Sequence, residues 1–382
     1  TMYIEARIVA LIIYSLVFMT TTTFCLCVHE KYRKIILCFY LLTLCIMGFF
    51  YVPPPGEDLY RLFIRMKSYS DLTIYDIINN FIELKETLTL SLYIFINYLE
   101  CDGLLPFIAV LITFGLSFNI LLDSSKGERN YFFTIAFILL MSRGFFGITI
   151  GNIRTMIAIS IGCYAIYKEF YKLEDFRYNF KYYIIASMFH VSGVLIFVSR
   201  MCYVFFDVDK NKVFYWGKIV ILLCSCVSMI FFYSFLFENI LLKFNHYTEV
   251  SREGEGFFYI WEFIITIIYL VFTLYMIYIN KKIKNKEPNE INAILHNNRF
   301  LNILLFFCIL EIIYGFIDYN VFFRFAFVFS ILNIPNYFMI IKKMTSNNIN
   351  TRSFNMKILV FSFIVFMLEI SRGNLCSLKF WE

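Results

Sequence analysis

Long stretches of apolar residues without a charge recur along the whole chain. Six of them approach the length that an α-helix needs to cross a bilayer, which is about 20 residues. They cover residues 8–28, 35–56, 103–122, 219–237, 263–280 and 325–341. The pattern predicts membrane-spanning helices at these places, and the first is too long for a cleaved signal peptide, so we expect it to remain as a span.

Five further apolar stretches contain polar or charged residues. They are 130–149 with Arg143, 153–170 with Arg154, 182–206 with His190 and Arg200, 300–317 with Glu311, and 358–370 with Glu369. A charge within a span costs about 2.5–3.5 kcal/mol on insertion scales, so function is best sought at these interruptions. Together the stretches predict an all-α polytopic integral membrane protein with about 10–12 transmembrane helices.

Basic residues gather in three short loops, at 29–34, 281–286 and 342–357. The positive-inside rule predicts that all three are cytoplasmic and that the N-terminus faces outward. Residues 53–103 and 238–256 then form external loops, and the short apolar run 88–99 is expected to be an interfacial helix. Alternation of sides also requires that one of the two apolar stretches between residues 182 and 238 is broken or re-entrant, and the Val191-Ser192-Gly193 step is the candidate for the break. No internal repeat is visible, so residues 1–382 are expected to form a single membrane domain.

Composition supports the same class of protein. Apolar residues make up 60% of the chain and charged residues 16%, which excludes an ordinary soluble domain. The net charge of +6 belongs to the basic loops and does not indicate nucleic-acid binding. Almost all of the 11 cysteines lie in apolar runs, and none has zinc-ligand spacing. The sequence therefore predicts no metal site, no disulfide framework and no cofactor.

Three arginines and one histidine fall near the outer half of the membrane in this topology: Arg143, Arg154, Arg324 and His190. Converging guanidinium groups bind phosphate oxygens in pairs and keep their charge, so the arginines are candidates for binding a multiply charged anion. The alternative is that an arginine reaches the interface or pairs with Glu311 or Glu369. His190 is either a satisfied structural histidine or a group that binds phosphate or sugar, or moves a proton.

The outer loops supply further candidates. Asp58 follows a proline-rich turn with Gly56, so its carboxylate can be held over the membrane surface, although a solvated loop acid is the alternative. Tyr60 stands close by. Glu249 and Arg252 in the second loop are candidate contacts for a sugar or a lipid head group, or simply solvated residues.

The order of these motifs resembles the EpsG-like branch of the Wzy O-antigen and exopolysaccharide polymerases. Four elements carry the resemblance: Gly56-Glu57-Asp58 with Tyr60, Ile153-Arg154-Thr155-Met156-Ile157-Ala158, Phe189-His190-Val191-Ser192, and Arg324 at the start of a late aromatic span. The first three are similar to Gly-Thr-Asp-Tyr, Leu-Arg-Gln-x-Leu-Ala and His-x-Ser elements of that family. Glu57 replaces a small Thr, Thr155 replaces the usual Gln, and prolines replace an Arg often seen before the Gly-x-Asp element. These departures leave Thr155 and the Gly56 turn without an assigned role.

The resemblance implies a metal-independent glycosyltransferase of the bacterial inner membrane with a GT-C-like fold and a site facing the periplasm or cell exterior. It implies transfer of a growing glycan from undecaprenyl diphosphate to a lipid-linked repeat unit, for O-antigen, lipopolysaccharide or capsule. Arg154, Arg143 and Arg324 would bind the diphosphate, and Asp58 or His190 would act as the base. Expected partners are lipid-linked oligosaccharides, membrane lipid, a chain-length regulator and a flippase.

Other classes of protein remain open at this stage. A lipid-linked oligosaccharide flippase would also have a cationic cavity, although an internal repeat would be expected. A membrane O-acyltransferase would use histidine near a cytoplasmic donor. A non-catalytic assembly or sensor protein would not need three arginines and an acid at one vestibule.

Overall fold

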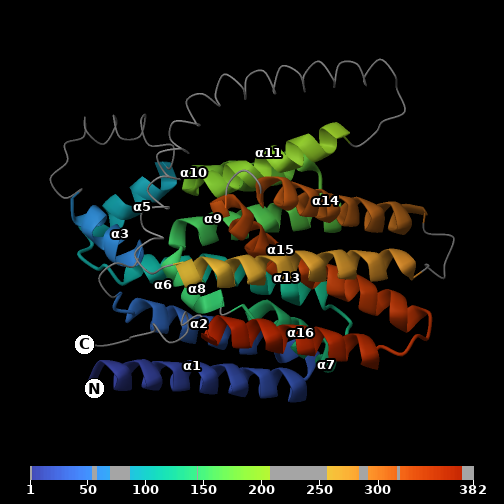
Figure 1. Cartoon of the computed structure of the whole chain (residues 1–382), viewed down its shortest axis with the longest axis horizontal. Coiled ribbons are helices and arrows are strands. Elements are labelled where there is room, and N and C mark those ends of the chain that lie inside the picture. Colours follow the sequence, from blue (N-terminus) through green and yellow to red (C-terminus); the bar gives the residue numbers. More distant parts are fainter. Residues whose placement is uncertain are drawn as a thin grey trace. The chain divides into compact units, whose positions relative to one another are not determined.

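We describe the protein from a computed structural model, in which the described residues are 2–53, 58–68, 87–143, 145–206, 256–283, 291–315 and 319–371. All regular elements in these ranges are helices (Figure 1). The first half contains α1 (Met2–Cys27), η1 (Glu30–Tyr32), α2 (Arg33–Phe49), α3 (Asp58–Lys67), α5 (Thr87–Tyr98), α6 (Leu104–Ser124), α7 (Asn130–Met141), α8 (Phe145–Gly151) and α9 (Ile153–Ile166). The second contains the π-helical turn η2 (Tyr167–Tyr171), α10 (Phe176–Phe189), α11 (Val191–Phe206), α13 (Gly256–Lys282), α14 (Ile291–Gly315), α15 (Tyr319–Ser346) and α16 (Arg352–Ser371).

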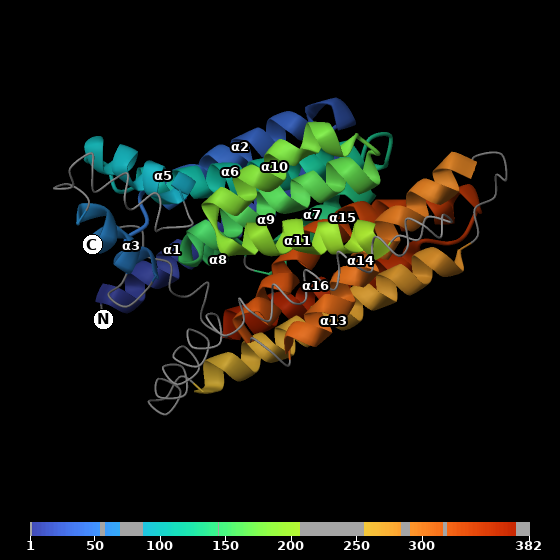
Figure 2. The same cartoon turned by 90° about the horizontal axis from the view of Figure 1, so that it is seen from above.

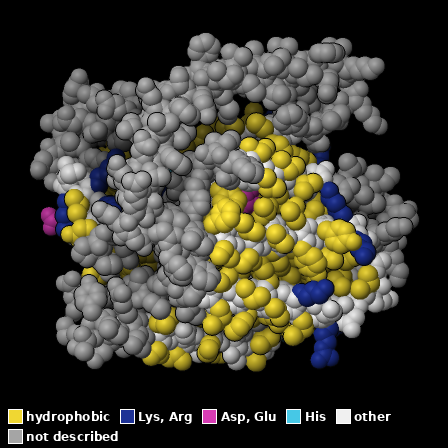
Figure 3. All heavy atoms as spheres, viewed as in Figure 1, with side chains coloured by type: hydrophobic (Ala, Val, Ile, Leu, Met, Phe, Trp, Pro, Cys, Tyr) yellow, Lys and Arg dark blue, Asp and Glu magenta, His cyan; other side chains and the backbone are white. Residues whose placement is uncertain are grey.

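Five helical segments within the described ranges are long and apolar enough to cross a membrane. They are Glu30–Phe49, Leu104–Ser124, Asn130–Gly151, Glu262–Lys282 and Phe322–Ser346. Large apolar side chains are exposed on several helices, as expected where lipid replaces water, and most of the side chains drawn in colour in Figure 3 are hydrophobic. The prediction of an all-α polytopic membrane protein is confirmed. The predicted span 219–237 and all of the predicted loop 238–256 except Gly256 lie outside the described residues.

Neighbouring helices pack in a continuous series. Helix α2 contacts α6, α6 contacts α9, and α9 contacts α10, while α7 contacts α1, α15 and α16 (Figure 2). Small residues allow close approach: a Cβ on Gly162 of α9 would come within 2.8 Å of Ile196 Cδ1. The chain divides into two compact units, residues 1–197 with 265–382, and residues 198–264. The single membrane domain expected from the sequence stays a prediction.

Two apolar stretches are broken where the sequence carries polar residues. The stretch 130–149 becomes α7 and α8, separated after Met141, and the stretch 182–206 becomes α10 and α11, separated at His190. His190 is extended, with φ −164° and ψ 154°, so the break comes one residue before the predicted Val191 step. Gly193 follows closely, because its backbone N–H donates to the His190 carbonyl at 2.8 Å. The short helix predicted at 88–99 is present as α5; its interfacial position stays a prediction.

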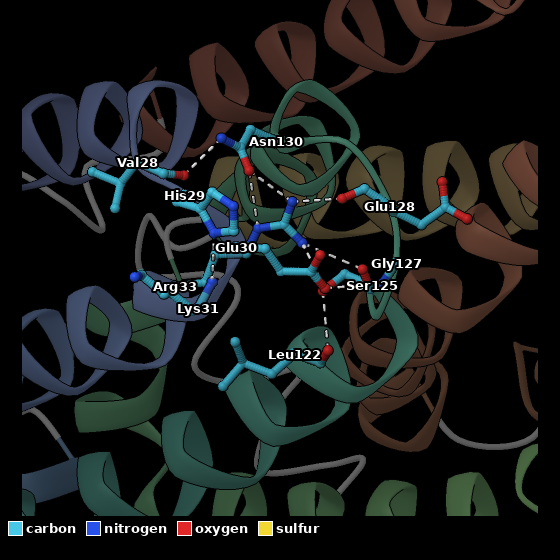
Figure 4. Close-up of polar contacts among 10 residues, drawn as sticks. All are labelled: Val28, His29, Glu30, Lys31, Arg33, Leu122, Ser125, Gly127, Glu128 and Asn130. Carbon is cyan, nitrogen blue, oxygen red and sulfur yellow. Dashed lines mark hydrogen bonds and ion pairs between the residues drawn. The ribbon is translucent and has the colours of Figure 1, made fainter.

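A polar cluster around Arg33 joins the turn between α1 and α2 to the turn between α6 and α7 (Figure 4). The Arg33 guanidinium donates to the Asn130 Oδ1 atom at 2.7 Å and to the carbonyls of Glu128 at 2.5 Å and Ser125 at 3.3 Å. The Asn130 amide donates in turn to the Val28 carbonyl at 2.6 Å. Arg33 is therefore buried, whereas the sequence placed it among the exposed positive charges of a loop.

The basic loops meet at one end of the helices, which we call the basic end. Partial burial raises the pKa of the Glu128 carboxyl, and the charges of Lys342 and Arg33 oppose this shift, so the first and third basic loops lie close together. Lys343 donates to the Asn280 carbonyl at 2.8 Å, which brings the end of α13 to the same place. The prediction that the three basic loops share one side agrees with these contacts; the identity of that side as cytoplasmic stays a prediction.

Candidate active site

Chain direction places the candidate residues at the end of the helices away from the basic end. Helix α7 begins at the basic end, so α8 and the start of α9 with Arg154 lie at the other end. Helix α10 starts after η2, whose Tyr167 hydroxyl donates to Asp123 at the end of α6, and so it delivers His190 to that other end. Helix α15 ends at the basic end, so its first turns, which carry Arg324, lie at the opposite end. We call this region the site end.

Short helices link these segments at the site end (Figures 1 and 2). Helix α3, which begins with Asp58, contacts α5 and α8, α8 contacts α9, and α5 contacts α10. The Thr89 hydroxyl on α5 donates to the Phe189 carbonyl at 2.7 Å, directly before His190. The elements that carry Asp58, Arg154 and His190 are thus connected through contacts among α3, α5, α8, α9 and α10.

Arg154 and Arg324 are both partly exposed, and they lie on helices that contact each other. Arg154 is the second residue of α9, and Arg324 is in the second turn of α15. The N-terminus of α9 adds to the positive potential, because its first backbone N–H groups have no partner within the helix and Asn152 makes no side-chain cap there. This arrangement suits an anion.

Arg143 has a different environment. Its side chain is 0% exposed, and its Nε atom lies 3.7 Å from Glu369 Oε1, on α16. Its guanidinium carbon lies 4.0 Å from the ring centroid of Phe327 and 5.4 Å from that of Tyr269. Of the two alternatives left open by the sequence, the structure shows the ion pair with a carboxylate.

His190 is buried, with 6% of its surface exposed. Its Nδ1 atom lies 3.0 Å from the Ser192 Oγ atom and accepts the Ser192 backbone N–H at 3.2 Å. Because Nδ1 accepts that bond, the neutral ring carries its hydrogen on Nε2. The His-x-Ser spacing noted in the sequence therefore has a local structural role: Ser192 orients the imidazole at the start of α11.

Asp58 is exposed by comparison. Its side chain is 56% exposed in the first turn of α3, and it lies 3.8 Å from Arg61 Nη1. Tyr60 is 38% exposed on the same helix. This geometry corresponds to the solvated acid that the sequence offered as the alternative. Glu249 and Arg252 lie outside the described residues.

Sequence reasoning gave Glu311 only the role of a possible partner for an arginine. The structure shows a carboxyl group that is 0% exposed, on the last turns of α14. Neither of its oxygens has a hydrogen-bond partner within the described part of the chain. Its position inside an apolar run was the signal that could have marked it, since buried carboxyl groups are rare unless paired.

The structure thus defines a polytopic helical membrane protein with buried and half-buried arginines, a histidine and acids at one end. A model of the EpsG family matches residues 60–380, which is most of the chain. The chain belongs to the EpsG family. Comparisons with curated proteins and with solved structures gave no match. Family membership indicates a polysaccharide polymerase in general terms, a glycosyltransferase-like enzyme in a membrane.

Proposed function

We propose that this protein is a polymerase that transfers a growing glycan from undecaprenyl diphosphate to the non-reducing end of a lipid-linked repeat unit. The reaction would take place at the outer face of the bacterial inner membrane. The observation that supports this proposal best is that two partly exposed arginines, Arg154 and Arg324, lie on the contacting helices α9 and α15 at the site end.

The leaving group explains why two arginines are needed there. When the bond between the anomeric carbon and the diphosphate breaks, the electron pair stays on the diphosphate oxygen, and its negative charge must be stabilised. Guanidinium groups fixed in a water-poor site meet this charge without a metal ion. Arg154, at the N-terminus of α9, is the first candidate, and Arg324 is the second.

The acceptor hydroxyl must lose a proton as it attacks. His190 is one candidate for the base; because its neutral ring carries the hydrogen on Nε2, it would take the proton only in the other tautomer, and in the present tautomer it would donate to a diphosphate or sugar oxygen. Asp58 is the other candidate, placed on α3 over the site end. Arg143, held by Glu369, would act as a positioning residue, because it lies in the break between α7 and α8.

A deletion strain provides the test. Without the gene, surface glycan should collapse to single repeat units, and Arg154→Ala should fail to restore long chains while still inserting in the membrane. Removal of a transition-state contact of this kind lowers rates about 100- to 1,000-fold. Arg129→Ala is the matched control, because Arg129 is an exposed arginine at the basic end. Gel analysis of surface glycan in Asp58→Ala and His190→Ala strains identifies the base as the residue whose loss abolishes long chains.

Other outcomes would support other functions. Complete loss of surface glycan, with lipid-linked units held inside, would indicate a flippase. Loss of an ester substituent alone would indicate an O-acyltransferase. Full chain length in the Arg154→Ala strain would contradict the proposed site. A chain-length regulator and a flippase are proposed partners, to be sought by co-purification of the full chain from membranes.

A further inference from the structure

Two buried glutamates in this protein differ in one respect. Glu369 and Glu311 are both 0% exposed and both lie in apolar helices. Glu369 pairs with Arg143 at 3.7 Å, whereas neither oxygen of Glu311 has a hydrogen-bond partner in the described part of the chain. Buried carboxyl groups without a partner are rare in folded proteins, because each one loses its hydration without compensation.

The level of Glu311 along the helices matches that of the proposed site. An α-helix rises about 1.5 Å per residue. Glu311 is four residues before the end of α14, so it lies about 6 Å along the helix axis from that end. Arg324 is five residues after the start of α15, so it lies about 7.5 Å along the axis from that start. Helices α14 and α15 contact each other and are joined in sequence across residues 316–318. Glu311 and Arg324 therefore belong to the same end and to similar depths.

The surroundings of Glu311 limit the chemistry of its ligand. Arg143 acts on this carboxyl electrostatically, but its guanidinium group is already paired with Glu369. A phosphate would be repelled by the ionised carboxylate. Among the described residues, no group of three His, Cys, Asp or Glu side chains is placed to hold a metal ion. A neutral hydroxyl group satisfies a carboxyl oxygen in either protonation state.

We propose that Glu311 binds hydroxyl groups of the glycan at the site end, its two oxygens accepting from adjacent hydroxyls of one sugar ring. This inference rests on the proposed polymerase function and adds a sugar contact to the diphosphate contacts of Arg154 and Arg324. The side chain is covered in the present structure, so glycan binding displaces the side chains that cover it.

The two glutamates form a matched pair for the experiment. Replacing Glu311 with leucine removes a buried carboxyl that has no hydrogen-bond partner among the described residues, so the unfolding temperature should stay the same or rise. Replacing Glu369 with leucine removes the ion pair of buried Arg143, so the unfolding temperature should fall. Both are measured on the full chain in lipid nanodiscs by thermal denaturation.

Elongation is measured on the same samples, with lipid-linked repeat units extracted from the deletion strain as substrate. Glu311→Leu should lower the initial rate about 10- to 100-fold at low concentrations of the repeat unit, and Glu311→Gln, which keeps one accepting oxygen, should lower it less. An elongation rate in Glu311→Leu equal to wild type would overturn the inference. So would a fall in its unfolding temperature like that of Glu369→Leu. If the wild-type protein itself formed no chains, the proposed function would fail, and the inference with it.

Discussion

At the residue scale, burial separates arginines that look alike in the sequence. Arg33 stands in a basic loop, yet its side chain is 3% exposed and donates to carbonyls of the turn between α6 and α7. Its neighbour Lys34 is exposed. Arg143 is enclosed by two aromatic rings and Glu369, while Arg154 is partly exposed. Substitution of the buried Arg33 or Arg143 would leave the partners of its guanidinium group unsatisfied.

Arg33→Ala should lower the free energy of unfolding by about 2–4 kcal/mol, because it leaves buried carbonyls and the Asn130 amide oxygen without their donor. Lys34→Ala should change it by less than about 0.5 kcal/mol, as exposed substitutions usually do. Thermal denaturation of both purified variants checks this. Equal unfolding temperatures for the two variants would contradict a structural role for the Arg33 cluster.

At the element scale, the corner between α10 and α11 fixes the position of His190. Residue 193 has to be small there, because a Cβ would lie 2.2 Å from the backbone carbonyl carbon and oxygen of Ala186. Ser192 then holds the imidazole by two contacts to Nδ1. The three residues after His190 therefore form the corner and fix the orientation of the His190 imidazole.

Gly193→Ala should open this corner and displace His190, with a large loss of polymer length and a lower unfolding temperature. Gly151→Ala is the control, because a Cβ on Gly151 meets nothing within 4 Å and alanine favours a helix by about 0.5–1 kcal/mol. Immunoblotting of membranes checks insertion, and gel analysis of surface glycan checks chain length. A Gly193→Ala strain with normal chain length would show that the corner is not needed for the reaction.

At the scale of the whole molecule, the basic end and the site end are predicted to face opposite sides of the membrane. Lys67 on α3 and Asn348 between α15 and α16 are both exposed and mark the two ends. In a cysteine-free background, Lys67→Cys should react with a membrane-impermeant maleimide from the outside. Asn348→Cys should react only after the membrane is opened. Labelling of both from the same side would contradict the predicted orientation.

The sequence by itself determined the class of protein and most of its helices. Long apolar runs have few alternatives to helices in lipid, because every backbone group must find its partner within the segment. The runs 8–28, 103–122 and 325–341 therefore correspond to α1, α6 and α15. A break close to His190 was also predicted from the sequence, whereas the break between α7 and α8 near Arg143 was not.

The tertiary structure decided which buried groups are paired. From the sequence, either Glu311 or Glu369 could be the ion-pair partner of Arg143, because spacing along the chain does not say which helices pack together. Packing of α16 against α7 gave the ion pair to Glu369 and left Glu311 on α14 without a hydrogen-bond partner among the described residues. The burial of Arg33 has the same origin, because its acceptors lie more than 90 residues away in the chain.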